Sequence, residues 1–413
     1  MKTRKISSII TLILTALLLG IYIFQNAPTT QNSNKNLRPQ WNNGGVNTEN
    51  LQALGYANNR FALSLFNEIW GQENNTFFSP LSIWMALAML YGGAEGNSAA
   101  QLEKVLYLPK NKTILQENIK YLLDKLDNGG NYTLKIANAL WPQINSSVKP
   151  EYAEALENYY YAYLQYLNYA KDPEKAIETI NSWVENQTNG KIKNLLHKGD
   201  VNPQTILVLT NAIYFYGLWN YPFNASKTNN GYFLTPHGRV KVKMMHGEFT
   251  LKYTEDKNAQ VVELPYKGKN ISMLVILPKT QDFEINLTQI QKWRENLRDA
   301  KVNISFPRFE MKERLNLKNS LERLGIKDIF DPARANLSGI SQSISVSNIV
   351  HQSYVKVDEN GTEAAAATGV SVVATALPLL PHVVFNADHP FLFLITDKIT
   401  GSILFMGWVA DPS

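Results

Sequence analysis

The side chains that usually carry out catalysis or bind metals are few in this chain, and they form none of the common motifs. The chain has no cysteine, which excludes disulfides, thiolate metal sites, iron–sulfur clusters and cysteine nucleophiles. No two of its six histidines lie three or four residues apart, so a pair of zinc ligands on one helix is not expected. The histidines are His197, His237, His246, His351, His382 and His389. Nucleophile-elbow, P-loop and dinucleotide-binding glycine motifs are also missing, so we expect no cofactor, and a hydrolase would need a triad of scattered residues.

Residues 359–382 have a composition that does not fit an ordinary connection. They link two predicted strands and read ENGTEAAAATGVSVVATALPLLPH, mostly small and apolar. A connection of roughly 20 residues in a compact domain is usually functional or disordered. Four consecutive alanines favour a helix–turn linker, whereas the largely β-branched residues 370–375 favour a strand. In an extended chain, one face would carry Thr362, Ala364, Ala366, Thr368, Val370 and Val372, so the segment could add to a sheet with that face buried.

The elements around this segment have the periodicities of a mixed helical and stranded fold. Apolar residues recur at helical spacing over 51–69, and Ser79-Pro80 starts a helix that ends at Gly92-Gly93. Further helices are predicted at 110–127, 150–161 and 173–188. Strands are predicted at 132–141, 205–215, 240–245, 249–253, 261–266, 271–277, 302–306, 344–358, 383–386, 391–395 and 402–409, with a hairpin turn at 267–270. Because helices dominate the first half and strands the second, without βαβ alternation, we predict one α+β domain over residues 49–413.

The amino terminus has the features of an export signal. A basic start with Lys2, Arg4 and Lys5 precedes a nearly continuous apolar run over residues 9–24. We interpret residues 1–26 as a signal peptide or a signal anchor, with a buried core helix as the alternative. Residues 27–48, rich in Asn and Gln, are expected to form a disordered linker. The protein is then expected to be secreted, or tethered to the outer face of the cytoplasmic membrane.

Charge argues against nucleic-acid binding. The formal net charge is +5, but three positive charges lie in the first five residues, so the remainder is close to neutral. The predicted helix at 110–127 carries Lys110, Lys112, Lys120 and Lys125, interleaved with Glu117 and Asp124. We interpret this helix as a solvated face, with a glycosaminoglycan site as the alternative.

Four other stretches of the sequence resemble those of one known family. They are residues 75–83 with 92–98, residues 209–219, residues 321–330 with 336–340, and residues 385–391 with 405–407. Residues 359–382 look like the reactive-centre loop of the same family. The chain is therefore similar to the serpins over residues 50–412.

The resemblance implies a fold and an activity. The fold is a single α+β domain in which helices pack on a large mixed or antiparallel main sheet, with smaller sheets and an exposed reactive-centre loop. Serpins are not enzymes; the loop is cleaved by a serine protease and inserts into the main sheet, carrying the protease as a covalent acyl complex. Insertion of a serpin loop is an established form of β-strand addition. The resemblance implies a monomer without a cofactor, and a serpin-fold binding protein that does not inhibit is the alternative.

Several residues match positions with known roles in the family. The residues that match the family's hinge are Glu359, Gly361, Thr362, Glu363, Ala364, Ala365, Ala366 and Ala367. In the family, a polar cluster controls the opening of the main sheet. The residues that match it here are Ser79, Ser82, Asn211 and His351. The residues that match the region where the loop enters the main sheet are Trp219 and Arg308. Arg308 is expected to pair with Glu359. For Trp219, the alternative is an ordinary core tryptophan.

The reactive bond is expected at Thr375–Ala376, counting from Gly361 by the family's usual hinge length. Counting back from Phe385 places it two residues later, before Pro378, and a proline after the bond blocks most serine proteases. Ala374–Thr375 and Ala376–Leu377 remain open as alternatives. Small residues around the bond indicate an elastase-like or subtilisin-like protease, and the absence of Arg and Lys from 370–382 argues against a trypsin-like one.

Overall fold

The structure, a computed structural model, describes residues 40–127, 132–280, 283–362 and 380–413. The predicted signal segment and most of the predicted linker lie outside these residues. The linker's last part contacts the folded body, because the Trp41 indole donates a hydrogen bond to the Tyr107 carbonyl at 3.3 Å. The Asn47 side chain caps helix α2, Thr48–Ile69. Within the described ranges, no helix is long and apolar enough to cross a membrane.

The five predicted helices are present, and three others accompany them. The described helices are α2 (Thr48–Ile69), α3 (Pro80–Gly93), α4 (Gly96–Leu106), α5 (Lys112–Asp127), α6 (Pro150–Tyr160), α7 (Pro173–Gln187), α8 (Leu287–Asn296) and α9 (Lys318–Leu324). Ser79 caps α3 by accepting a hydrogen bond from the Ser82 amide, and Pro80 occupies the first turn. Nearly all of α3 is buried, as its continuous apolar sequence predicts.

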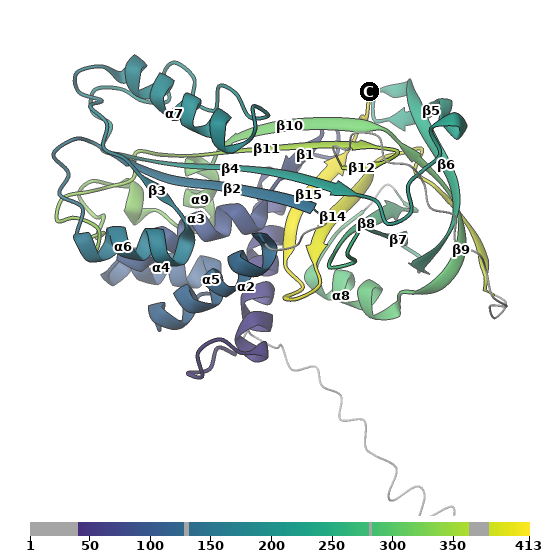
Figure 1. Cartoon of the computed structure of the whole chain (residues 1–413), viewed down its shortest axis with the longest axis horizontal. Coiled ribbons are helices and arrows are strands. Elements are labelled where there is room, and N and C mark those ends of the chain that lie inside the picture. Colours follow the sequence, from purple (N-terminus) through teal and green to yellow (C-terminus); the bar gives the residue numbers. More distant parts are fainter. Residues whose placement is uncertain (1–39, 128–131, 281–282, 363–379) are drawn as a thin grey trace, which may run out of the picture. The chain divides into compact units, whose positions relative to one another are not determined.

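A six-stranded sheet, called the main sheet below, is sandwiched between helices (Figure 1). Its order is β10 (Phe309–Asn316), β11 (Asn348–Asp358), β12 (Gly361–Thr362), β4 (Leu207–Leu218), β2 (Tyr132–Pro142) and β3 (Tyr163–Leu164). Helix α3 packs on one face through the larger core cluster. Helix α7 packs on the other face, where Ile180 and Val184 join Val208 and Ala212 of β4.

A second sheet has nine strands and forms the right-hand part of the molecule in Figure 1. Its order is β1 (Thr76–Phe78), β15 (Ile403–Val409), β14 (Phe391–Asp397), β8 (Ile271–Pro278), β7 (Ala259–Pro265), β6 (Gly238–Glu255), β9 (Arg298–Pro307) and β13 (His382–Asn386), with β5 (Asn229–Thr235) paired to β6. Two predicted strands, 240–245 and 249–253, are parts of the single strand β6. The strand predicted at 344–358 begins only at Asn348. The predicted α+β class and mixed main sheet are confirmed, because β4 and β11 are parallel while the other pairs nearby are antiparallel.

Candidate hinge and sheet-opening site

The two residues of β12 lie between β11 and β4 and pair with both. Gly361 lies opposite Asp358 of β11 and Leu218 of β4, and Thr362 lies opposite Val357 and Gly217. Beyond this point β11 and β4 pair directly with each other, from Tyr354 opposite Tyr214 to Asn348 opposite Val208. The main sheet is therefore opened at one end by two residues of the predicted hinge and closed along the rest of these strands.

Gly361 is required by both its backbone conformation and its close neighbours. Its φ angle is +153°, in a region that side chains rarely adopt. A Cβ atom added there would lie 2.0 Å from the Gly217 carbonyl oxygen and 2.8 Å from the Leu218 Cα. Only glycine fits at this entry point between the strands.

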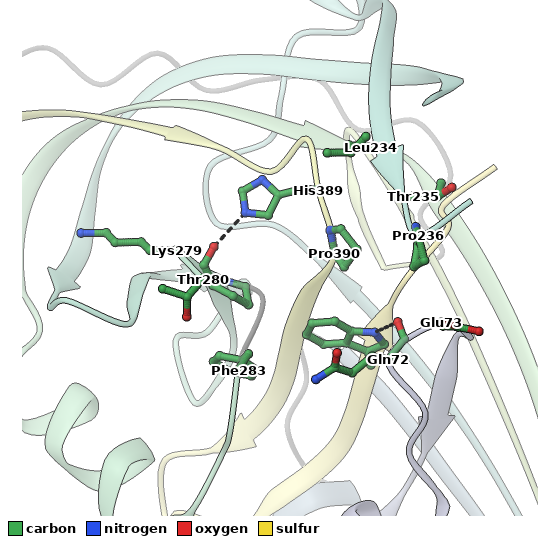
Figure 2. Close-up of a pocket in the computed structure, with 12 residues that line it drawn as sticks. Gln72, Glu73, Leu234, Thr235, Pro236, Lys279, Thr280, Phe283, His389 and Pro390 are labelled. Atoms are coloured by element: carbon green, nitrogen blue, oxygen red, sulfur yellow. Dashed lines mark hydrogen bonds between the residues drawn. The ribbon is translucent and has the colours of Figure 1, made fainter. Parts of the chain in front are cut away.

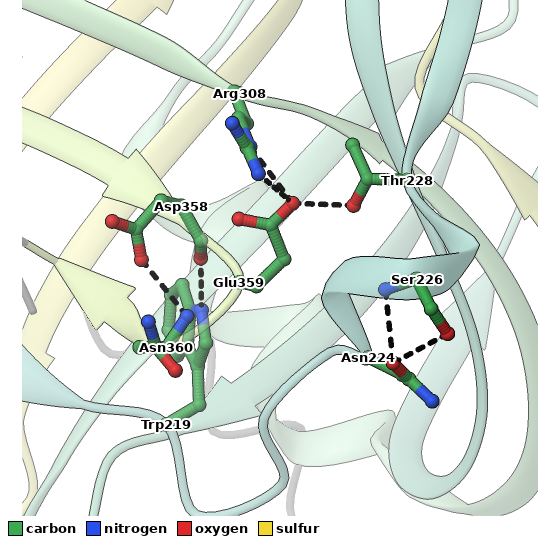
Figure 3. A network of polar contacts seen from close by, with 8 residues as sticks. All are labelled: Trp219, Asn224, Ser226, Thr228, Arg308, Asp358, Glu359 and Asn360. Atoms are coloured by element: carbon green, nitrogen blue, oxygen red, sulfur yellow. Dashed lines mark hydrogen bonds and ion pairs between the residues drawn. The ribbon is translucent and has the colours of Figure 1, made fainter. Parts of the chain in front are cut away.

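Aromatic residues surround the first inserted side chain. The Thr362 hydroxyl is buried and forms a 2.6 Å hydrogen bond with the Tyr266 hydroxyl. The ring of Tyr266 stacks on Trp219 with centroids 4.5 Å apart. The Trp219 indole donates to the Asp358 carbonyl at 2.9 Å, and its amide donates to the Asn360 carbonyl at 2.8 Å (Figure 3). Trp219 therefore supports the turn from which the hinge enters the sheet.

Glu359, in that turn, is held by two side chains from other elements. Its carboxylate accepts hydrogen bonds from the Arg308 guanidinium, at 2.8 Å from Nε and also from Nη2, and from the Thr228 hydroxyl (Figure 3). Burial alone raises the pKa of Glu359, but the bonds from Arg308 and Thr228 outweigh burial and hold the pKa below its usual value. The predicted pairing with Arg308 is present, and Thr228 is a partner that the sequence does not indicate.

The four residues predicted to form a polar cluster lie together beneath the main sheet. His351 on β11 and Asn211 on β4 are directly opposite each other, and the imidazole Nδ1 lies 2.5 Å from the Asn211 Oδ1. The Ser79 amide donates to the His351 Nε2 at 3.1 Å, and the Ser79 hydroxyl donates to the Leu404 carbonyl at 2.6 Å. Asn211 Nδ2 donates to the Ser82 carbonyl at 3.1 Å. The cluster therefore joins α3 to the two strands between which the hinge enters.

The protonation state of His351 follows from these bonds. Because Nε2 accepts from an amide, Nδ1 carries the hydrogen and donates it to Asn211. Burial lowers the pKa of His351 to about 3, although the bond to Asn211 opposes this shift. The imidazole is therefore neutral near pH 7, and protonation would remove its acceptor for Ser79.

Comparison with known proteins places this geometry in one family. Residues 56–412 match the sequence profile of Serpin (serine protease inhibitor). The chain belongs to the serpin family. The chain is 40% identical over 383 residues to the leukocyte elastase inhibitor of Homo sapiens, covering 88% of this chain and 100% of that protein. It is 39% identical over 373 residues to an uncharacterized serpin-like protein of Methanosarcina acetivorans, covering 87% and 86%. Serpin48 of the insect Tenebrio molitor has a similar structure, with a TM-score of 0.79, 33% identity, and coverage of 88% and 99%.

As a member of the family, this serpin is a protease inhibitor and not an enzyme. Its partner is a target protease. Among the residues that the structure describes, no group of three or more His, Asp or Glu could hold a metal ion. The hinge residues Glu363, Ala364, Ala365, Ala366 and Ala367 and the reactive bond Thr375–Ala376 lie outside the described residues, so their assignments stay predictions.

One member of the polar cluster is not predicted from the sequence. Asn138 on β2 lies opposite Asn211, and its Oδ1 accepts a hydrogen bond from Asn211 Nδ2. The signal that could have found it is its polarity within a strand that is otherwise buried in this part. Asn138 therefore extends the cluster across a third strand.

Proposed function

We propose that this serpin inhibits extracytoplasmic serine proteases with a pocket for small residues. In this proposal the protease cleaves the reactive-centre loop, remains attached as an acyl enzyme, and is carried along as residues 362–375 insert between β4 and β11. The observation that carries the proposal is β12, since Gly361 and Thr362 already lie between β4 and β11, and Thr362 is the first residue of that path.

The pairing of β12 defines where the following residues would lie. Continued one residue at a time, the register places Thr368 opposite Asn211 of β4 and opposite His351 of β11. Residues opposite each other share a face of the sheet, so the Thr368 hydroxyl would point toward the polar cluster. Insertion would widen the spacing between β4 and β11 from about 4.8 Å to about 10 Å and break the His351–Asn211 bond. Thr368 supplies a hydroxyl at the position where that bond is lost.

The energy of insertion is large enough to drive such a mechanism. Fourteen inserted residues would span about 45 Å at ~3.3 Å each. About a dozen additional ladder bonds, at about 1 kcal/mol net each, would contribute roughly 10 kcal/mol. This equals a typical protein stability of about 5–15 kcal/mol, so the intact protein would be kinetically trapped in a state that is not its lowest in free energy.

Target and location are inferred from the sequence around the loop and at the amino terminus. Thr375–Ala376, with Ala374 before it, suits the shallow pocket of elastase-like or subtilisin-like proteases. The relative named leukocyte elastase inhibitor supports an elastase-like target. The basic start and apolar run within residues 1–26 support secretion, or a tether to the outer face of the cytoplasmic membrane.

Incubation of the protein with pancreatic elastase, subtilisin or trypsin tests the proposal. We expect elastase or subtilisin to form a complex that survives boiling in denaturing electrophoresis, and trypsin to form none. Mass spectrometry should find a released fragment that begins at Ala376. Clean cleavage by elastase and subtilisin without a covalent complex would contradict inhibition and favour a binding protein with the serpin fold.

A further inference from the structure

One exposed face of the nine-stranded sheet combines basic and apolar side chains. In the antiparallel pairing of β5 with β6, Leu234 lies opposite Arg239, and Tyr232 lies opposite Lys241. Lys243 follows two residues further along β6, opposite Asn230. Directly opposite residues share a face, and all of these side chains are exposed, with Tyr232 and Leu234 each at 55%. Tyr232, Leu234, Arg239, Lys241 and Lys243 are called the β5–β6 face below.

The cations of the β5–β6 face have no acidic partner among the residues that the structure describes. The Arg239 guanidinium lies over the Tyr232 ring at 5.2 Å. On α5, Lys112 pairs with Glu95 at 3.0 Å and Lys120 bonds to the Asn158 carbonyl and the Tyr161 hydroxyl, whereas Lys125 lies over the Tyr121 ring at 5.2 Å. The structure therefore places three neighbouring cations on β6 that have no acidic partner in the described part of the chain, at positions that the sequence analysis does not single out.

The β5–β6 face lies close to the strand that follows the reactive-centre loop. The described chain resumes at Leu380, β13 ends at Asn386, and the Asp388 carbonyl then accepts a hydrogen bond from the Leu234 amide at 2.7 Å. Asp388 lies thirteen residues after Thr375 of the predicted reactive bond, a chain length of at most about 43 Å. A protease of about 220 residues has a radius of gyration of about 17 Å, which corresponds to a compact body about 44 Å across, so a protease bound at the loop can reach the β5–β6 face.

A groove beside the face can receive an apolar side chain (Figure 2). It has a volume of about 410 Å³, and Leu234 and Pro236 line it together with Pro390, Phe283 and Trp408. Tyrosine and arginine are the residue types that contribute most to protein interfaces, whereas a purely ionic site needs no apolar neighbour. The mixture on the β5–β6 face therefore fits a protein surface better than a simple polyanion.

We propose that the β5–β6 face is a second contact surface for the target protease and selects proteases with an acidic surface. This inference rests on the proposed function, because it takes the loop to be the first contact. Arg239, Lys241 and Lys243 attract carboxylates of the approaching protease, and Tyr232 and Leu234 pack against its apolar side chains. Attraction of this kind accelerates association and weakens as salt is added.

The test uses pancreatic elastase and subtilisin, each native and after succinylation, which converts surface lysines to carboxylates. We expect the wild-type protein to react with the succinylated forms at least about tenfold faster than with the native forms at low salt. The R239Q/K241Q/K243Q variant should lose this preference. A K104Q/K110Q/K125Q variant, with the same change in net charge at exposed lysines of α4, its following loop and α5, should retain it.

Four results would contradict the inference, and a fifth would refute the proposed function. If the wild-type protein and both variants prefer the succinylated proteases equally, the face makes no contact. If both variants lose this preference equally, the effect is one of net charge alone. If heparin binds the wild-type protein through Arg239, Lys241 and Lys243 while succinylation gives no acceleration, the face is a polyanion site instead. A complete absence of cleavage and complex with every form would refute the proposed function itself, whereas complexes at unaltered rates would refute only the second contact.

Discussion

His351 and Asn211 lie opposite each other on β11 and β4, so their hydrogen bond crosses the line along which the main sheet would open. The Glu359 carboxylate, held by Arg308 and Thr228, fixes the turn at the end where the hinge enters. Leaving a buried polar group without a partner costs roughly 1–3 kcal/mol. Opening the sheet therefore has a cost at single residues that the inserting strand has to compensate.

Replacing His351 should change how stability depends on pH. Its pKa is about 3 in the folded protein and near 6.5 in the unfolded chain. Between these values the unfolded chain binds a proton that the folded protein does not, so stability falls as pH falls, by up to ~1.4 kcal/mol per pH unit. We expect His351→Gln to flatten the free energy of unfolding between pH 6.5 and roughly 4, measured by urea denaturation. The same slope as in the wild-type protein would contradict the assignment, and His197→Gln, at an exposed site, is the control.

Gly361→Ala should expel the hinge. The added Cβ would lie 2.0 Å from the Gly217 carbonyl oxygen, so β12 cannot remain between β4 and β11. We expect faster hydrogen exchange at the amides of β12 and its neighbours, together with several times more inhibitor consumed per protease trapped. Asn360→Ala changes the preceding residue without this clash and serves as the control. Unchanged exchange in Gly361→Ala would mean that the hinge does not depend on glycine.

At the scale of elements, the sequence predicts three of the six strands of the main sheet, β2, β4 and β11, and misses β10, β3 and β12. Strands β2 and β4 are predictable because their apolar patterns are local. In β6, the exposed residues before Met244 are mostly odd-numbered, and those after it are mostly even-numbered. The alternation of exposed and buried residues is therefore interrupted, and the sequence pattern predicts two strands instead of one. Asn138 and Thr228 are missed because their roles depend on strand register and on contacts between distant segments. The position of β12 between β4 and β11 is also not predictable from the sequence. It depends on the separation of these two strands, which are distant from each other in the sequence.

Thr368 provides a test of the strand register in the inserted state. Thr368→Val keeps the shape of the side chain but removes the hydroxyl that would meet His351 and Asn211. We expect the intact variant to be as stable as the wild-type protein, whereas the cleaved variant should lose about 1–3 kcal/mol, measured by denaturant unfolding of both forms. Thr368→Ser retains the hydroxyl and should behave like the wild-type protein. A similar loss in the serine variant, or none in the valine variant, would contradict the register.

For the whole molecule, the relevant quantity is the difference in free energy between the intact and the inserted states. In the described chain β4 and β11 are paired over seven residues below β12. The inserted strand would replace this one ladder with two, while the helices on both faces keep the core covered. In the proposed mechanism, the main sheet therefore gains its additional strand only after the loop is cut.

Cleavage of the loop should therefore raise the melting temperature by at least about 10 °C, since roughly 10 kcal/mol of new pairing is spread over a large domain. Scanning calorimetry of the protein before and after limited cleavage by elastase measures the difference. Ala366→Pro removes a backbone donor and places a rigid ring in the middle of the inserting segment, so its cleaved form should melt close to its intact form. The cleaved wild-type protein and the cleaved proline variant have the same broken bond, so comparing each with its own intact form isolates the contribution of insertion. If both melt at the temperature of the intact protein, no free energy is stored for insertion and the mechanism fails.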